Sequence, residues 1–253
     1  MNPVWLSLAV ATTVFSGGLI GLQLHRILPP EHLTRETQDV VRLGTGMLSV
    51  LASLVLGLLI STAKTSSDTT DRAMRGFAAE LILLDETLRD YGDMARPPRA
   101  ILHQYAERAL EDHWPASPNS AARIDNRATG MLLERVREQI RALKPADNGQ
   151  RGLQDEALRV STTLLQQRWL LIEQAGETVR PLVLAILVSW VFFIFASFGL
   201  NAPRHATVVT AFLVSSIAIG CSVFLILALD RPFEGPLRIS SEPMLNVLAH
   251  MTE

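Results

Sequence analysis

The sequence predicts an all-α fold, a polytopic membrane protein with four transmembrane helices and a helical cytoplasmic domain between helices 2 and 3. One observation is that four stretches of the 253 residues contain no Asp, Glu, Lys or Arg. The other is that the polar segment 64–180 has apolar residues at helical spacing and no strand-like alternation of useful length. The uncharged stretches are 4–24, 43–63, 181–203 and 206–229.

Each uncharged stretch is long enough to cross a bilayer. The shortest have 21 residues, and a helix of that length rises roughly 31 Å, about the thickness of the hydrocarbon core. The first stretch could instead be a secretory signal. However, only three uncharged residues precede it, the apolar run is longer than a usual signal core, and no small-x-small cleavage site leads into a soluble domain. We therefore expect 4–24 to be the first span.

Basic residues near the span ends predict the orientation. Four spans put both termini, the segment 64–180 and the tail 230–253 on one side. Eight Lys or Arg residues lie near the span ends on that side and four lie near the span ends on the other side. Because the cytoplasmic side usually carries more Lys and Arg, we expect both termini and the segment 64–180 to be cytoplasmic. The eight are Lys64, Arg72, Arg75, Arg159, Arg168, Arg180, Arg231 and Arg238; the four are Arg26, Arg35, Arg42 and Arg204.

The segment 64–180 is predicted to be helical throughout, with breaks at 96–98, 114–119 and 144–149, where Pro, Asn and Gly gather. Its last helix is expected to run almost directly into the third span, because Pro181 suits the first turn of a helix. Only a few residues around 201–205 join the third and fourth spans, so these spans should form an antiparallel hairpin.

The second span has the clearest pattern, with small or hydroxylated residues at strict four-residue spacing. Such spacing lets helices approach closely in lipid, so a tight helix–helix contact is one interpretation. The other is that part of this helix lines a conduction path, with its hydroxyls meeting water or ions. The same spacing recurs in the first and fourth spans, which favours packing. The residues in the second span are Thr45, Ser49, Ser53, Gly57, Ser61 and Thr65.

A polar cluster, 64–68, follows the second span directly. Hydroxyls and a carboxylate ahead of a helical pattern are typical of a helix start, so Asp68 is expected to cap the next helix. The alternative is a ring of charge at the mouth of an oligomeric channel.

Several classes of function find no support in the sequence. A net charge of −2 does not favour a nucleic-acid partner. The six histidines include no HExxH motif, so no metal or other cofactor is expected. The sequence contains no nucleotide-binding motif and no nucleophile-elbow motif. Its acidic pairs are adjacent residues, which point to different faces of a helix, and its spans carry no charge. We therefore expect no enzyme. The lone Cys221 lies in the fourth span and is expected to be a packing residue.

The second span also carries a family resemblance. Its residues 53–58, SLVLGL, resemble the SFVLGF-like stretch in the second helix of bestrophin anion channels. Over nearly the full chain, the four-span layout, residues 57–66 (GLLISTAKTS) and residues 224–235 (FLILALDRPFEG) resemble a bacterial bestrophin-like membrane-protein family of unknown function.

The resemblance implies a homo-oligomer, a pentamer in bestrophins, in the bacterial inner membrane with a central anion pathway. Its apolar pore neck would be formed by Val50, Leu54 and Leu58, next to the small residues Ser49, Ser53, Gly57 and Ser61. Two features depart from bestrophins. The exit of the second span has no aromatic residues, and the turn at 232–235 leads to no acidic calcium-binding cluster, so calcium gating is not expected.

Two functional hypotheses follow. The first is an oligomeric channel that conducts small anions passively through an apolar neck, which can gate by dewetting without a charged filter. The second is a membrane-anchored interaction or sensory protein, whose spans sit among membrane lipids and whose cytoplasmic helices bind an unknown protein partner.

Overall fold

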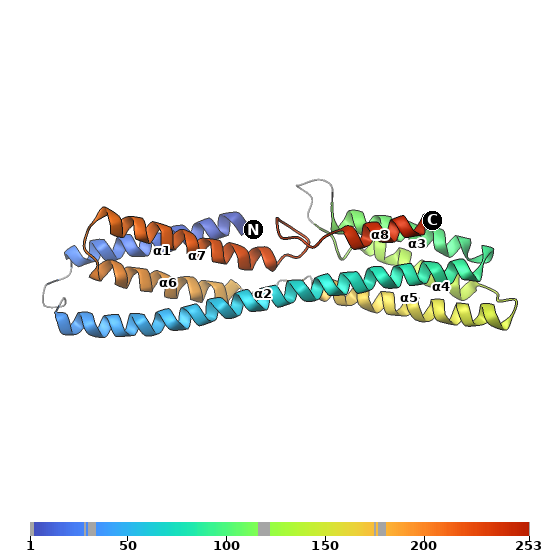
Figure 1. The fold of residues 1–253 in the computed structure, drawn as a ribbon, viewed down its shortest axis with the longest axis horizontal. Coiled ribbons are helices and arrows are strands. Elements are labelled where there is room, and N and C mark those ends of the chain that lie inside the picture. The colour runs from blue at the N-terminus through green and yellow to red at the C-terminus, as the bar shows by residue number, and fades with distance from the viewer. Residues whose placement is uncertain are drawn as a thin grey trace. The chain divides into compact units, whose positions relative to one another are not determined.

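The computed structural model describes residues 3–27, 29, 34–115, 122–174, 176 and 181–252. Within these residues the chain forms helices and no strand, so the predicted all-α fold class is confirmed. The chain divides into two compact units, which we call the membrane unit (1–65 and 177–230) and the bundle unit (66–176 and 231–253). The helices (Figure 1) are α1 Pro3–Ile27, α2 Arg35–Tyr91, the 3-10 helix η2 Asp93–Ala95, α3 Arg96–His113, α4 Arg127–Ala142, α5 Asn148–Gln174, α6 Pro181–Asn201, α7 Ala206–Leu229 and α8 Glu242–Met251.

The membrane unit contains α1, the first part of α2, α6 and α7. All four helices are long and apolar enough to cross a bilayer, which confirms the four predicted spans. The predicted hairpin of the last two spans is also present, since α6 ends at Asn201 and α7 begins at Ala206. Arg204, in the turn between them, donates from Nη2 to the carbonyl of Leu22 on α1 over 3.1 Å.

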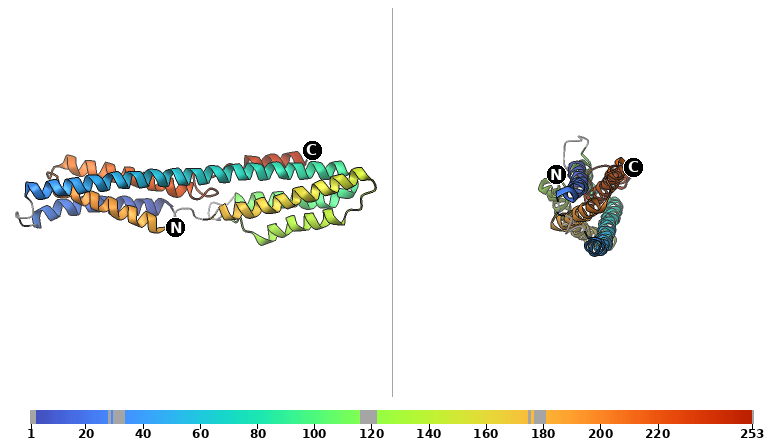
Figure 2. Two further views of the ribbon diagram at one scale, coloured as in Figure 1. Left: turned by 90° about the horizontal axis from the view of Figure 1, so that it is seen from below. Right: turned by 90° about the vertical axis from the view of Figure 1, so that its left-hand side faces the viewer.

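α1 lies beside α6 and α7 (Figure 2), and glycines let the helix backbones approach closely. A Cβ placed on Gly21 would overlap the carbonyl group of Ala196, and one on Gly199 would overlap the carbonyl oxygen of Gly18. A Cβ on Gly220 of α7 would come within 2.9 Å of the Cβ of Ala11. The four-residue spacing of small residues therefore reflects close packing in the first and fourth spans.

The bundle unit contains the rest of α2 with α3, α4, α5 and α8, and it has its own apolar core. The predicted break at 96–98 exists but lies a few residues earlier, at 92–95, and residues 96–98 form the start of α3. α2 ends before Gly92, whose φ of 100° favours glycine, and prolines occupy the first turn of α3. The break at 144–149 is confirmed between α4 and α5. Part of the break at 114–119, and the predicted junction of the last bundle helix with the third span, lie outside the described residues.

The prediction that Asp68 caps a new helix is wrong, because α2 continues without a break from Arg35 to Tyr91. The hydroxyl-rich cluster does not need a helix end to satisfy its side chains. The hydroxyl of Thr70 donates to the carbonyl of Ser66, one turn earlier, over 3.1 Å. The second span and the first helix of the bundle unit are thus one helix, and the predicted domain boundary at residue 64 falls inside it.

A partly buried ion pair joins α2 to α3 in the bundle unit. Arg99 donates from Nε and Nη2 to the two carboxylate oxygens of Asp85 over 2.9 and 2.8 Å, and the Asp85 side chain is 2% exposed. This pairing raises the pKa of Arg99 above its ordinary value, mainly through the hydrogen bond to Asp85.

Replacing Arg99 with alanine is expected to lower the free energy of unfolding by about 3 kcal/mol, because the Asp85 carboxylate would be left buried without its partner. The measurement is detergent-induced unfolding of the purified protein. The control is Arg96→Ala, since Arg96 pairs with Asp93 at the surface and such pairs contribute little. Equal effects of the two substitutions would contradict the prediction.

An aromatic cluster at the end of α3 holds the segment that leads to α8. The ring centroids of His113 and Trp114 lie 5.5 and 5.7 Å from that of Phe233. Trp114 donates from Nε1 to the carbonyl of Ile239 over 2.8 Å. Burial lowers the pKa of His113; the hydrogen bond to the carbonyl of Ala109 and the charge of Asp112 oppose this shift, and the charge of Arg168 adds to it.

This burial predicts a pH dependence of stability. Because the folded pKa of His113 lies below its unfolded value of about 6.5, the unfolded chain binds the proton first as the pH falls. The stability that the buried, neutral His113 contributes is therefore complete above pH 6.5, and it is lost as the pH falls through the folded pKa. We expect the unfolding temperature to drop between pH 7.5 and 5.5, and to drop less in His113→Phe. An equally large drop in His113→Phe would contradict the prediction.

Candidate functional site

The predicted pore neck lies on α2, which is the least buried of the four spans. Only 11% of its apolar stretch is buried within the chain, against 33% in each of the others. Val50, Leu54 and Leu58 are 70%, 69% and 65% exposed. Since they follow one another at four-residue spacing, they lie along one side of the helix.

This exposed side begins nearer the start of α2 than the predicted neck, which began at Val50. Val40, Leu43 and Met47 are as exposed as the neck residues, and their spacing of three and four residues continues the same stripe. The sequence shows these residues at helical spacing. However, spacing alone does not distinguish a helix side that faces lipid from one that faces a partner. We call the six residues Val40, Leu43, Met47, Val50, Leu54 and Leu58 the α2 stripe.

The opposite side of α2 packs against the rest of the membrane unit. Ala52 is buried in the apolar core of this unit, with Val55 and Leu59 packed partly against it. The hydroxyl of Thr45 is buried and lies 2.6 Å from the hydroxyl of Ser197 on α6. This pairing fixes which side of α2 turns inward and therefore which side stays uncovered.

The small residues of α2 do not all share one environment. Ser49 and Ser53 donate their hydroxyls to the carbonyls one turn earlier, over 2.8 Å each. Ser53, Gly57 and Ser61 are exposed, and a Cβ on Gly57 would meet nothing within 4 Å. Within one chain Gly57 therefore makes no close helix contact, in contrast to Gly21 of α1. Whether these three residues line a path or pack against a second copy stays a prediction.

The chemistry of the stripe is that of an apolar surface. The part of α2 between residues 43 and 63 carries no charge, and the serine hydroxyls at 49 and 53 are already bonded to the helix itself. Within the described residues, no three His, Cys, Asp or Glu side chains gather in an arrangement that could hold a metal ion. What the stripe can offer is a dry constriction, if several copies surround a common axis.

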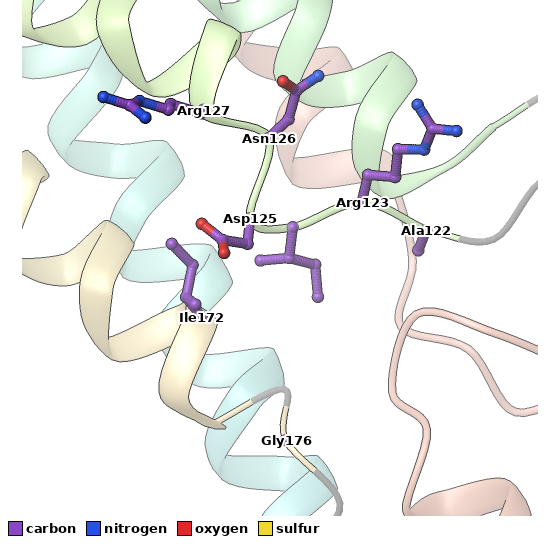
Figure 3. Close-up of a pocket in the computed structure, with 8 residues that line it drawn as sticks. Ala122, Arg123, Asp125, Asn126, Arg127, Ile172 and Gly176 are labelled. Atoms are coloured by element: carbon purple, nitrogen blue, oxygen red, sulfur yellow. The ribbon is translucent and has the colours of Figure 1, made fainter.

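A pocket in the bundle unit shows a different arrangement. It has a volume of about 550 Å³ and lies beside the start of α4. Figure 3 shows the guanidinium groups of Arg123 and Arg127 directed away from each other, while the carboxylate of Asp125 lies near the apolar Ile172. Its polar groups therefore do not converge on one point, as a binding site for a small polar ligand would require.

Comparison with known proteins identifies the fold. A family described as the Bestrophin-like domain matches residues 12–244. Several crystal structures of a bacterial bestrophin homolog from Klebsiella pneumoniae are similar. A point-mutant form has a TM-score of 0.69 at 14% sequence identity and covers 99% of this chain and 97% of that one.

Two further structures of the same homolog give TM-scores of 0.68 and 0.63, at 13% and 15% identity. The first covers 97% of both chains, and the second covers 95% of this chain and 96% of that one. No curated protein matches the sequence. At these identities the structures show the fold, and the family match over nearly the full chain shows the relationship. The chain belongs to the bestrophin-like family.

Proposed function

We propose that the protein is a homo-oligomeric channel that conducts small anions passively, without enzymatic activity. Five copies, the number that the resemblance to bestrophins implies, surround one axis, and α2 of each copy faces it. Val50, Leu54 and Leu58 form the apolar neck. The protein lies in the bacterial inner membrane with both termini in the cytoplasm.

The observation that carries the proposal is the exposure of the α2 stripe. The other three spans bury a third of their apolar stretch within the chain, whereas α2 buries about a ninth. A surface of this kind is covered either by lipid or by further copies of the chain. Membership of the bestrophin-like family supports the second choice.

The neck residues also have the chemistry that passive conduction requires. A ring of valine or leucine side chains holds no ion tightly, so an ion that enters can leave again. Such a ring closes by dewetting when it is narrow and opens with a small gain in radius. No titration or covalent step is involved.

The test is the particle mass of the purified protein in detergent, followed by flux from liposomes. We expect an oligomer close to five times the chain mass of 27.8 kDa and halide efflux that exceeds the efflux of potassium. A monomer excludes a shared pore. An oligomer without flux would favour the membrane-anchored interaction protein, and flux of potassium alone would contradict the proposed anion preference.

A further inference from the structure

A second feature of the membrane unit is a cavity between the end of α1 and the start of α7. It has a volume of about 600 Å³, and none of the proposed neck residues is among the residues that line it. Its walls combine apolar and polar side chains and come from two spans and the turn before α7. They are Leu19, Leu22, Gln23 and Ile27 of α1, with Arg204, His205, Ala206 and Val209.

The walls change in character along the cavity. Arg204 and His205 precede the first residue of α7, at the end of the uncharged stretch, where a span leaves the bilayer. Leu19 lies eight residues before Ile27, roughly 12 Å deeper along α1. The cavity therefore has a polar end at the level of lipid headgroups and an apolar end within the hydrocarbon region.

Arg204 brings a positive charge that the surrounding helices do not neutralise. α1, α6 and α7 contain no Asp or Glu. Among the described residues the hydrogen bond of Arg204 is the one from Nη2 to the carbonyl of Leu22, and its side chain forms no ion pair. That bond anchors the guanidinium at the cavity and leaves its other N–H groups for an anion.

We propose that this cavity binds an anionic phospholipid, with the headgroup phosphate on the guanidinium of Arg204 and an acyl chain along Leu19, Leu22 and Val209. The match of charge at one end and of apolar surface at the other favours a lipid over a soluble anion. The site is separate from the neck, so it can hold lipid whether or not the protein conducts.

Native mass spectrometry of the full-length protein with added phosphatidylglycerol or phosphatidylcholine tests this proposal. We expect phosphatidylglycerol to bind more tightly, and Arg204→Gln to weaken it about fivefold, as for one basic residue near an anionic surface. Arg204→Lys should retain most of the preference. Val209→Trp, which fills the apolar end, should weaken both lipids.

The matched control is Arg35→Gln, which removes an arginine near the same end of the spans but outside the cavity. The proposal is overturned if Arg204→Gln and Arg35→Gln have equal effects, or if the two lipids bind equally well. It is also overturned if inorganic phosphate at millimolar concentration displaces the lipid, because the site would then recognise a soluble anion. None of these results depends on oligomer number or flux.

Discussion

Replacing Leu54 with serine is expected to raise ion flux from liposomes about tenfold, which corresponds to a barrier lower by about 1.4 kcal/mol. In a homo-oligomer the substitution changes every copy, so a ring of apolar side chains becomes a ring of hydroxyls. Water then remains in the constriction, and an ion passes without losing its hydration shell to a dry surface. Leu58→Ser, one turn further along the same side, should act in the same direction.

The matched control is Leu182→Ser on α6. Leu182 and Leu54 are 70% and 69% exposed, both lie in uncharged spans, and the chemical change is identical. If the exposed side of α2 faces lipid rather than a pore, the two variants should behave alike. Equal flux in Leu54→Ser, Leu182→Ser and the unchanged protein would therefore contradict the assignment of the neck.

A second comparison separates conduction from damage to the fold. Ala52 lies close to Leu54 in the sequence but on the buried side of α2. Ala52→Leu should disturb packing in the membrane unit and lower stability without widening the neck. An increase in flux with Ala52→Leu as large as with Leu54→Ser would indicate leakage through a disordered protein.

The sequence was sufficient to predict the spans, because a run of about 20 uncharged residues has few other uses in a folded chain. It was not sufficient to predict where α2 ends. The cluster at 64–68 has the composition of a helix start, yet the same side chains can bond to carbonyls one turn earlier inside a helix, as Thr70 does with Ser66. Composition alone cannot choose between these outcomes. The break between α2 and α3 was predicted a few residues too late, because the two prolines lie in the first turn of α3 and the chain turns at Gly92 before it.

The candidate site shows a similar limit. Gly21 and Gly57 both belong to four-residue patterns of small residues in uncharged spans, and the patterns look alike. Their surroundings are opposite, because Gly21 meets the backbone of α6 and Gly57 meets nothing within 4 Å in the same chain. Which span lies against which is decided by tertiary packing, so the sequence could place Leu54 and Leu58 on one side of α2 but could not say that this side stays uncovered.

This difference predicts the largest effect on stability. Gly21→Val should lower the free energy of unfolding by about 4 kcal/mol, above the usual 1 to 3 kcal/mol for an overpacked core. The reason is that the obstacle to a Cβ at Gly21 is the carbonyl group of Ala196, which belongs to the backbone of a regular helix and cannot rotate away as a side chain can. The measurement is unfolding in mixed micelles with increasing SDS, followed by tryptophan fluorescence.

Gly44→Val is the matched control, because a Cβ at Gly44 of α2 meets nothing within 4 Å. Valine also favours helix more than glycine does, so this variant should unfold at the same SDS fraction or a higher one. If Gly21→Val were as stable as Gly44→Val, α1 and α6 could not lie at backbone contact in the membrane. The packing of the helices in the membrane unit would then be wrong. The proposed neck would lose its support, because it depends on which side of α2 this packing leaves uncovered.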